Sequence, residues 1–239
     1  MNGSPLTAEV AFTIGPVAVT MPVVITWGIM AVLFVFSVFS TRRLAVIAGP
    51  VQTVLELLVT TIDAQIEATI QRNPAPYRML IGSLFLFILV ASWTSLIPGL
   101  EPPTATLETD AALASVVFLA TIYFGIRSNG VRGYLKTFAD PSWVMIPLNL
   151  VEQITRTFSL MVRLFGNVMS GVFVVGIVLS LAGLLVPIPL MALDLLTGAV
   201  QAYIFAVLAT VFIGAAIAEN GTKHRPPAPP APSETKGTN

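Results

Sequence analysis

A set of polar side chains recurs every three or four residues within one of the longest apolar tracts of this 239-residue chain. The set comprises Glu152, Arg156, Ser159, Arg163, Asn167 and Ser170. In an α-helix, where each residue adds about 100°, these side chains fall within an arc of about 80°. A continuous polar stripe on an otherwise apolar helix lines water, a polar partner or an ion path.

Arg163 lies within this stripe, in the run Ser-Leu-Met-Val-Arg-Leu-Phe-Gly-Asn that covers residues 159–167. An arginine at bilayer depth costs about 2.5–3.5 kcal/mol on insertion scales. It keeps its charge there, because a guanidinium group is not deprotonated in proteins. A permanent cation inside an apolar segment therefore predicts ion handling.

A second, weaker polar stripe lies on the last apolar segment of the chain. Its members are Asp194, Thr197, Gly198 and Gln201. Asp194 has two interpretations: a structural salt bridge with an arginine of the neighbouring helix, or a protonatable group that relays ions. Asp194 is expected towards one side of the membrane and Glu152 towards the other, with Arg163 between them. This order predicts two offset half-channels separated by a fixed cation.

The composition predicts that these segments lie in a bilayer. Hydrophobic residues make up 55% of the chain and charged residues 10%, and the mean hydropathy is +0.87. Since each span needs about 20 apolar residues, we expect an all-α polytopic membrane protein with about five membrane helices. The expected spans cover residues 23–39, 77–97, 111–126, 143–185 and 190–218.

Three further segments complete the expected organisation. Residues 50–72 carry apolar and acidic side chains at helical spacing, which predicts an amphipathic helix at the membrane surface or against a partner. Pro187 and Pro189 are expected in the turn between the last two helices. Residues 1–220 form a single membrane domain in this interpretation, and the proline-rich residues 221–239 form a disordered tail.

Apart from Arg156 and Arg163, which lie within a membrane helix, the lysine and arginine residues fall on one side of the membrane if the chain crosses it as expected. Residues 1–21 and 98–110, on the other side, contain neither. Cytoplasmic loops carry the excess of basic residues in membrane proteins. The sequence therefore predicts a multi-pass protein of the bacterial inner membrane, with the N-terminus outside and the C-terminus in the cytoplasm.

The chemistry available to the chain is limited by what it lacks. It contains no cysteine, and its one histidine, His224, lies in the polar tail, so we expect no metal site and no cofactor. No glycine-rich loop with Gly-Lys-Ser/Thr is present, so we expect no direct nucleotide binding. Nucleic acid is not an expected partner.

Two motifs resemble the signature of subunit a of F-type ATP synthases. The first comprises Pro-Leu-Asn-Leu-Val-Glu at 147–152 and the run at 159–167, and the second is Gln-Ala-Tyr-Ile-Phe-Ala-Val-Leu at 201–208. The similarity extends over roughly residues 20–220 in the order of spans. It implies a stator subunit whose long, tilted C-terminal hairpin packs against a ring of c subunits. The other implied partners of the chain are membrane lipid and the b subunits of a peripheral stalk.

The resemblance also implies roles for individual residues. Arg163 matches the essential arginine that faces the ring carboxylates, Glu152 an acidic position of the cytoplasmic half-channel, and Asp194 a relay of the outer half-channel. Asn167 and Gln201 match family positions along the channel, and Arg156 stands where many members carry lysine or arginine. Ser159 and Ser170, from the polar stripe, are expected to line the channel with them. The chain is then part of an ion-translocating ATP synthase, although it carries no site that hydrolyses ATP.

The chain departs from the family pattern in two places. Val172 stands one turn past Asn167, where many members carry an acidic residue or histidine, so the outer relay would depend on Asp194 alone, assisted by water or Ser170. The acidic residues of the outer loop, Glu108 and Asp110, are displaced by a few positions. These departures fit a divergent lineage, and the choice between H⁺ and Na⁺ depends mainly on the ring.

Two alternatives of other classes stay open at this point. A stand-alone secondary transporter or channel would explain the polar stripes equally well, although the chain has no internal repeat. A scaffold or assembly protein would need Arg163 and Asp194 only as a structural pair.

Overall fold

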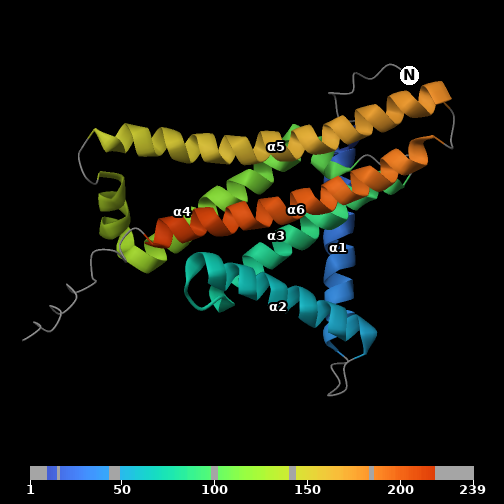
Figure 1. Ribbon diagram of the computed structural model, residues 1–239. Helices are drawn as coiled ribbons and strands as arrows, with labels where there is room; N and C mark the ends of the chain where they lie inside the picture. Colours follow the sequence, from blue (N-terminus) through green and yellow to red (C-terminus); the bar gives the residue numbers. More distant parts are fainter. Residues whose placement is uncertain are drawn as a thin grey trace, which may run out of the picture.

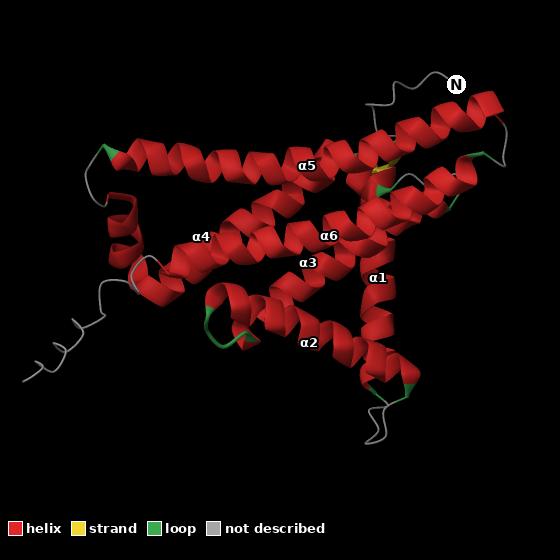
Figure 2. Ribbon diagram, viewed as in Figure 1, coloured by secondary structure: helices red, strands yellow, loops and turns green. Residues whose placement is uncertain are grey.

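The computed structural model describes residues 10–14, 17–42, 49–97, 102–139, 144–182 and 186–218. Nearly all of these residues are helical, apart from one short hairpin (Figures 1 and 2). The α-helices are α1 (Met21–Thr41), α2 (Pro50–Ile70), α3 (Ala75–Trp93), α4 (Leu107–Ala139), α5 (Met145–Ala182) and α6 (Pro187–Ala218). Two 3₁₀ turns, η1 (Thr94–Leu96) and η2 (Pro103–Ala105), lie between α3 and α4. The predicted all-α architecture is confirmed.

Within the described ranges, five helices are long and apolar enough to cross a membrane. The longest of these segments, Met145–Leu181 in α5, has 37 residues. At 1.5 Å per residue it measures about 55 Å, whereas the hydrocarbon core is about 30 Å thick. Helices α5 and α6 run across the direction of α1 in Figure 1, which is the arrangement expected of strongly tilted spans.

The chain begins with an element that the sequence interpretation did not include. Strands β1 (Val10–Ile14) and β2 (Val17–Thr20) pair in antiparallel register, with Ile14 opposite Val17. Both strands are rich in valine, isoleucine and threonine, which favour extended backbone. Their short length had hidden them beside the much longer apolar helices.

Helix α4 is longer than the third expected span, residues 111–126. It continues to Ala139 across a kink at Gly130, whose φ is 71° and ψ 162°. Only glycine adopts this conformation without steric strain, so the backbone bends here and the helix resumes. The expected span of residues 111–126 was therefore too short at its C-terminal end.

The last helix also begins earlier than expected. Pro187 and Pro189 lie in the first turn of α6, not in a turn before it. Proline is tolerated there because the first N–H groups of a helix have no intrahelical acceptor. Residues 183–185 and the tail from 219 onwards fall outside the described residues, so the predicted domain boundary stays a prediction.

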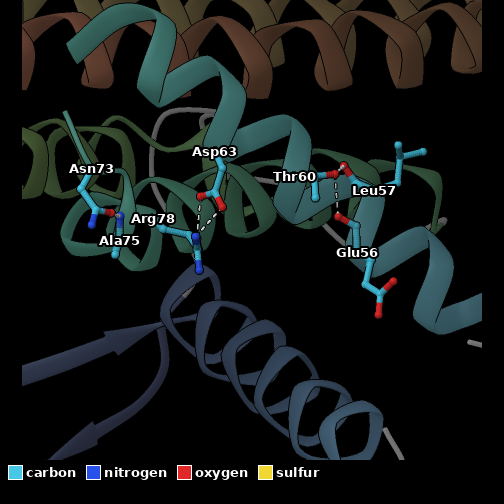
Figure 3. A network of polar contacts seen from close by, with 7 residues as sticks. All are labelled: Glu56, Leu57, Thr60, Asp63, Asn73, Ala75 and Arg78. Atoms are coloured by element: carbon cyan, nitrogen blue, oxygen red, sulfur yellow. Dashed lines mark hydrogen bonds and ion pairs between the residues drawn. The ribbon is translucent and has the colours of Figure 1, made fainter. Parts of the chain in front are cut away.

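The C-terminal half of α2 packs on the bundle. Ile66 and Ile70 are buried against α3 and α6, in an apolar cluster that includes Tyr77, Ile213 and Ile217. Outside this cluster, Arg78 of α3 forms an ion pair with Asp63 of α2 (Figure 3). The predicted amphipathic helix therefore has part of its own chain as a partner, while its N-terminal half keeps Val54 and Leu57 exposed.

A second apolar cluster joins the four helices that carry the candidate site. Its buried members are Leu84, Ile88, Ala114, Val117, Leu160, Leu164, Ala202, Phe205 and Ala209. The first two residues belong to α3, the next two to α4, the next two to α5 and the last three to α6. The cluster fixes the rotation of α5, because Leu160 and Leu164 are at most 2% exposed.

Candidate functional site

The rotation of α5 leaves its polar stripe on the open face of the bundle. Glu152, Ser159, Arg163 and Ser170 are exposed, and Arg156 and Asn167 are partly buried. The buried residues of the same helix, Leu160, Leu164 and Val168, recur every four residues. At about 100° per residue, they lie on the side of the helix next to the stripe. The helical phase deduced from the sequence therefore matches the packing of α5 in the bundle.

A cavity of about 560 Å³ lies between the first half of α5 and the last turns of α6. Four of the predicted site residues line it, namely Glu152, Arg156, Ser159 and Arg163. Helix α6 contributes Leu208 and Phe212 to its wall. The cavity thus brings the cation and the carboxylate of one predicted half-channel into a shared hollow, whereas Asp194 lies elsewhere.

Glu152 and Arg156 form an ion pair one turn apart on α5. The guanidinium of Arg156 also lies over the ring of Phe212, 5.5 Å from its centroid. Such a cation–π contact ties the ion pair to α6. The sequence interpretation listed both charges as site residues but did not foresee that they pair.

Arg163 has no ion-pair partner among the described residues. The scaffold interpretation required Arg163 and Asp194 to pair, and the structure does not bring them together. Arg163 instead presents its charge at the open face, beside the cavity. A cation in this position is available to a group that arrives from outside the chain.

Asp194 is partly buried between α5 and the end of α3. Its Oδ2 atom accepts a hydrogen bond of 3.0 Å from the hydroxyl of Ser95 in η1. Its Oδ1 atom lies where a Cβ on Gly171 of α5 would stand. Ser170, which the sequence interpretation named beside water as an assistant of Asp194, donates to the carbonyl of Asn167 at 2.9 Å. The hydroxyl next to Asp194 belongs to Ser95 instead.

Gln201 and Asn167 carry polar atoms that are shielded from solvent. Gln201 is 6% exposed, and within the described part of the chain neither its Nε2 atom nor the Nδ2 atom of Asn167 has a hydrogen-bond partner. Gly198, one turn before Ala202, packs so closely on α3 that a Cβ there would lie 2.8 Å from the Cβ of Ser92.

Sequence reasoning missed two residues around Asp194. Ser95 belongs to the short polar run 92–95 at the end of the second span, and that run was the only available signal. Gly171 carried no signal, because its importance comes from the approach of a residue on another helix. The predicted site therefore gains two residues: Ser95, which donates a hydrogen bond to Asp194, and Gly171, which leaves room for the Asp194 carboxylate because it has no side chain.

Two long apolar helices that carry a solvent-facing arginine, with carboxylates towards either end, are typical of ion-translocating membrane proteins. Comparison with known families specifies the class further. The family model described as ATP synthase A chain matches residues 23–214. The chain belongs to this family.

Relatives extend the match over nearly the whole chain. ATP synthase subunit a 2 of Bradyrhizobium sp. (strain BTAi1) is 56% identical over 217 residues, which cover 91% of this chain and 97% of the relative. ATP synthase subunit a of Albidiferax ferrireducens is 47% identical over 209 residues, 87% and 88% of the two chains. ATP synthase subunit a 1 of Chlorobaculum parvum is 46% identical over 204 residues, 84% and 90% of the two chains.

These comparisons confirm the family predicted from the two motifs. They also confirm the predicted function at the level of the complex, as the ion-translocating subunit of an F-type ATP synthase, and they do not favour a stand-alone transporter. With five apolar helices of spanning length, the chain is a multi-pass membrane protein.

Proposed function

We propose that this chain is the stator against which a ring of c subunits turns, with Arg163 as the fixed cation that each ring carboxylate passes. The observation that carries this proposal is the position of Arg163, exposed on the open face of α5 and unpaired among the described residues. A cation that served only to hold the fold together would be expected to have a partner in the bundle.

The physical role of Arg163 follows from Coulomb attraction. At about 4 Å and an effective dielectric constant near 20, a guanidinium and a carboxylate attract each other by about 4 kcal/mol. The ring carboxyl group is therefore stabilised in its ionised form when it reaches Arg163, and it releases its ion into a half-channel. The same fixed charge prevents ions from crossing between the half-channels without rotation of the ring.

The two half-channels are assigned to the two ends of the hairpin. The cavity with Glu152, Arg156 and Ser159 is the cytoplasmic entrance, because it lies on the side of the basic loops. Asp194, with Ser95, belongs to the outer half-channel, and Asn167, Ser170 and Gln201 line the route towards Arg163. The proposed orientation puts the N-terminus outside and the C-terminus in the cytoplasm of a bacterial inner membrane.

The catalytic class and the partners follow from this assignment. The chain acts as the ion-translocating part of a translocase, and H⁺ or Na⁺ is its substrate. Its partners are the c-ring on the open face of α5, membrane lipid, and b subunits of a peripheral stalk near the exposed N-terminal half of α2. Residues 1–220 are assigned to one membrane domain.

The proposal is tested by purification and crosslinking. The complex purified through a tag on this chain is expected to contain c and b subunits. A photocrosslinker attached to a cysteine in place of Ser159, on the open face, is expected to capture the c subunit, because the native chain contains no other cysteine. The same reagent at Leu119, which is 63% exposed on α4, serves as the control. Equal capture from both positions, or no c subunit at all, would contradict the stator assignment.

A further inference from the structure

Five residues at one end of the bundle carry buried polar side-chain atoms that have no hydrogen-bond partner among the described residues. The atoms belong to Ser92, Thr104, Asp110, Asn167 and Gln201. Asp110 is the extreme case, because the residue is 0% exposed and both of its carboxylate oxygens lack a partner. We name these five residues the polar layer.

The members of the polar layer lie at one level of the bundle. Four of them stand about one helical turn from a member of the second apolar cluster, in the direction of the end where α3 stops and α4 begins. The pairs are Ser92 after Ile88, Asp110 before Ala114, Asn167 after Leu164 and Gln201 before Phe205. Thr104 belongs to η2, which packs against α3, α4 and α5 at this end.

Packing contacts place the polar layer between Asp194 and Arg163. Ser92 packs on Gly198, one turn from Asp194 on α6, and Ser95 donates its hydrogen bond to Asp194. On the other side, Asn167 lies one turn from Arg163 on the same helix. The layer therefore connects the two groups that the proposed outer half-channel must join.

A dry polar layer would be energetically costly. Buried polar atoms in folded proteins are satisfied by protein groups or by ordered water, and a carboxylate without either is the most expensive case. The first turn of α4 favours a negative charge at Asp110 through the helix dipole, but it supplies only part of the compensation. A bound proton, water or a cation must supply the rest.

We propose that Asp110 is a third carboxylate of the ion path, in a hydrated layer that carries a monovalent cation between the outer end of the bundle and Arg163. This inference rests on the proposed stator function and adds a residue on α4 that the two motifs do not contain. The carboxylate of Asp110 and the hydroxyls of Thr104 and Ser92 offer hard oxygen ligands to a proton carried by water or to Na⁺. The amide groups of Asn167 and Gln201 continue the polar route towards Arg163.

The first test compares Asp110→Asn with Glu108→Gln in the assembled ATP synthase. Both changes remove one carboxylate from the first turn of α4, but Glu108 is exposed. We expect Asp110→Asn to lower ATP-driven ion uptake by inverted vesicles by about two orders of magnitude, as for loss of an acid–base group, and Glu108→Gln to leave it unchanged. Uptake is measured with H⁺ alone and with Na⁺ plus a protonophore, which separates the two cations.

Stability distinguishes transport from a structural role. Asparagine has almost the same shape as aspartate, and the side chain of Asp110 has no described hydrogen bond to lose. Asp110→Asn should therefore assemble normally and unfold at the same or a higher temperature. Failure of this variant to assemble, or uptake within about twofold of the unchanged complex, well short of the loss expected for an acid–base group, would overturn the inference.

Hydration of the layer is tested separately by the reaction of single cysteines with Ag⁺. Ser92→Cys lies in the polar layer, whereas Ala114→Cys lies one turn away in the apolar cluster and is 1% exposed. We expect Ag⁺ to consume the thiol at position 92 and to spare the thiol at 114. Equal protection of both thiols would contradict a hydrated layer. The stator function is tested separately, by the substitution of Arg163.

Discussion

The carboxylate of Asp194 occupies the space that a side chain on Gly171 would fill. This close approach of α6 to α5 holds Asp194 at the interface of the two long helices, where Ser95 donates a hydrogen bond to it. The position of the proposed outer relay therefore depends on the absence of a Cβ at residue 171.

Replacing Gly171 with alanine should displace Asp194. A Cβ at this position overlaps the carboxylate, and overpacking of this kind costs about 1–3 kcal/mol. We expect lower thermal stability of the complex and a loss of ATP-driven ion uptake of several-fold. Gly176→Ala is the matched control, because that glycine lies on the same helix with nothing within 4 Å of the added atom. Identical behaviour of the two variants would refute the contact.

Asp194 should be more important than the hydroxyl that supports it. Asp194→Asn removes the titratable group, and we expect ion uptake to fall by about two orders of magnitude. Ser95→Ala removes only the hydrogen bond, which is worth about 1.5–3 kcal/mol when the acceptor is charged, so a smaller loss is expected. The two changes together should cost little more than Asp194→Asn alone. Ser180→Ala, an exposed hydroxyl on α5, is the control; a mild phenotype of Asp194→Asn would argue for a structural role.

The ion pair of Glu152 and Arg156 should contribute little to stability. Its side chains are 52% and 42% exposed, and exposed pairs at this spacing contribute about 0.3–0.5 kcal/mol. Glu152→Gln should therefore leave the unfolding temperature of the complex nearly unchanged while it slows ion uptake through the cytoplasmic cavity. A large fall in stability together with normal uptake would show that the pair is structural.

The kink of α4 should be sensitive to any side chain at residue 130. Gly130 has φ 71° and ψ 162°, a region in which other residues are strained by about 1–3 kcal/mol. Gly130→Ala is expected to lower the yield and stability of the complex, with unchanged ion uptake per assembled complex. Gly28→Ala in α1, which also adds a Cβ in open space, should do neither. Equal stability of the two variants would contradict the strained backbone at the kink.

The sequence predicts those parts of the site that lie on one helix. The stripe from Glu152 to Ser170 follows from helical periodicity alone, and the packing of Leu160 and Leu164 agrees with it. Contacts between helices could not be predicted in this way. Ser95 and Asp194 are 99 residues apart in sequence, and no local pattern joins them.

The misjudged elements share a related cause. The kink at Gly130 and the early start of α6 at Pro187 place glycine and proline inside helices. Both residue types usually mark helix ends. At Gly130 the helix continues on either side of the kink, and at Pro187 the proline is tolerated because the first N–H groups of a helix have no intrahelical acceptor. Asp110 was assigned to a loop because it is charged, and only the packed bundle shows that it is buried.

The most direct test of the central claim is ATP-driven ion uptake by vesicles that contain the Arg163→Ala complex, with Arg127→Ala as the control for loss of an exposed arginine. We expect the Arg163 variant to assemble with its c-ring and to lose uptake by about three orders of magnitude, the equivalent of about 4 kcal/mol. A passive ion leak is expected with it, because the barrier between the half-channels is removed. Coupled uptake at the rate of the Arg127→Ala complex would contradict the account.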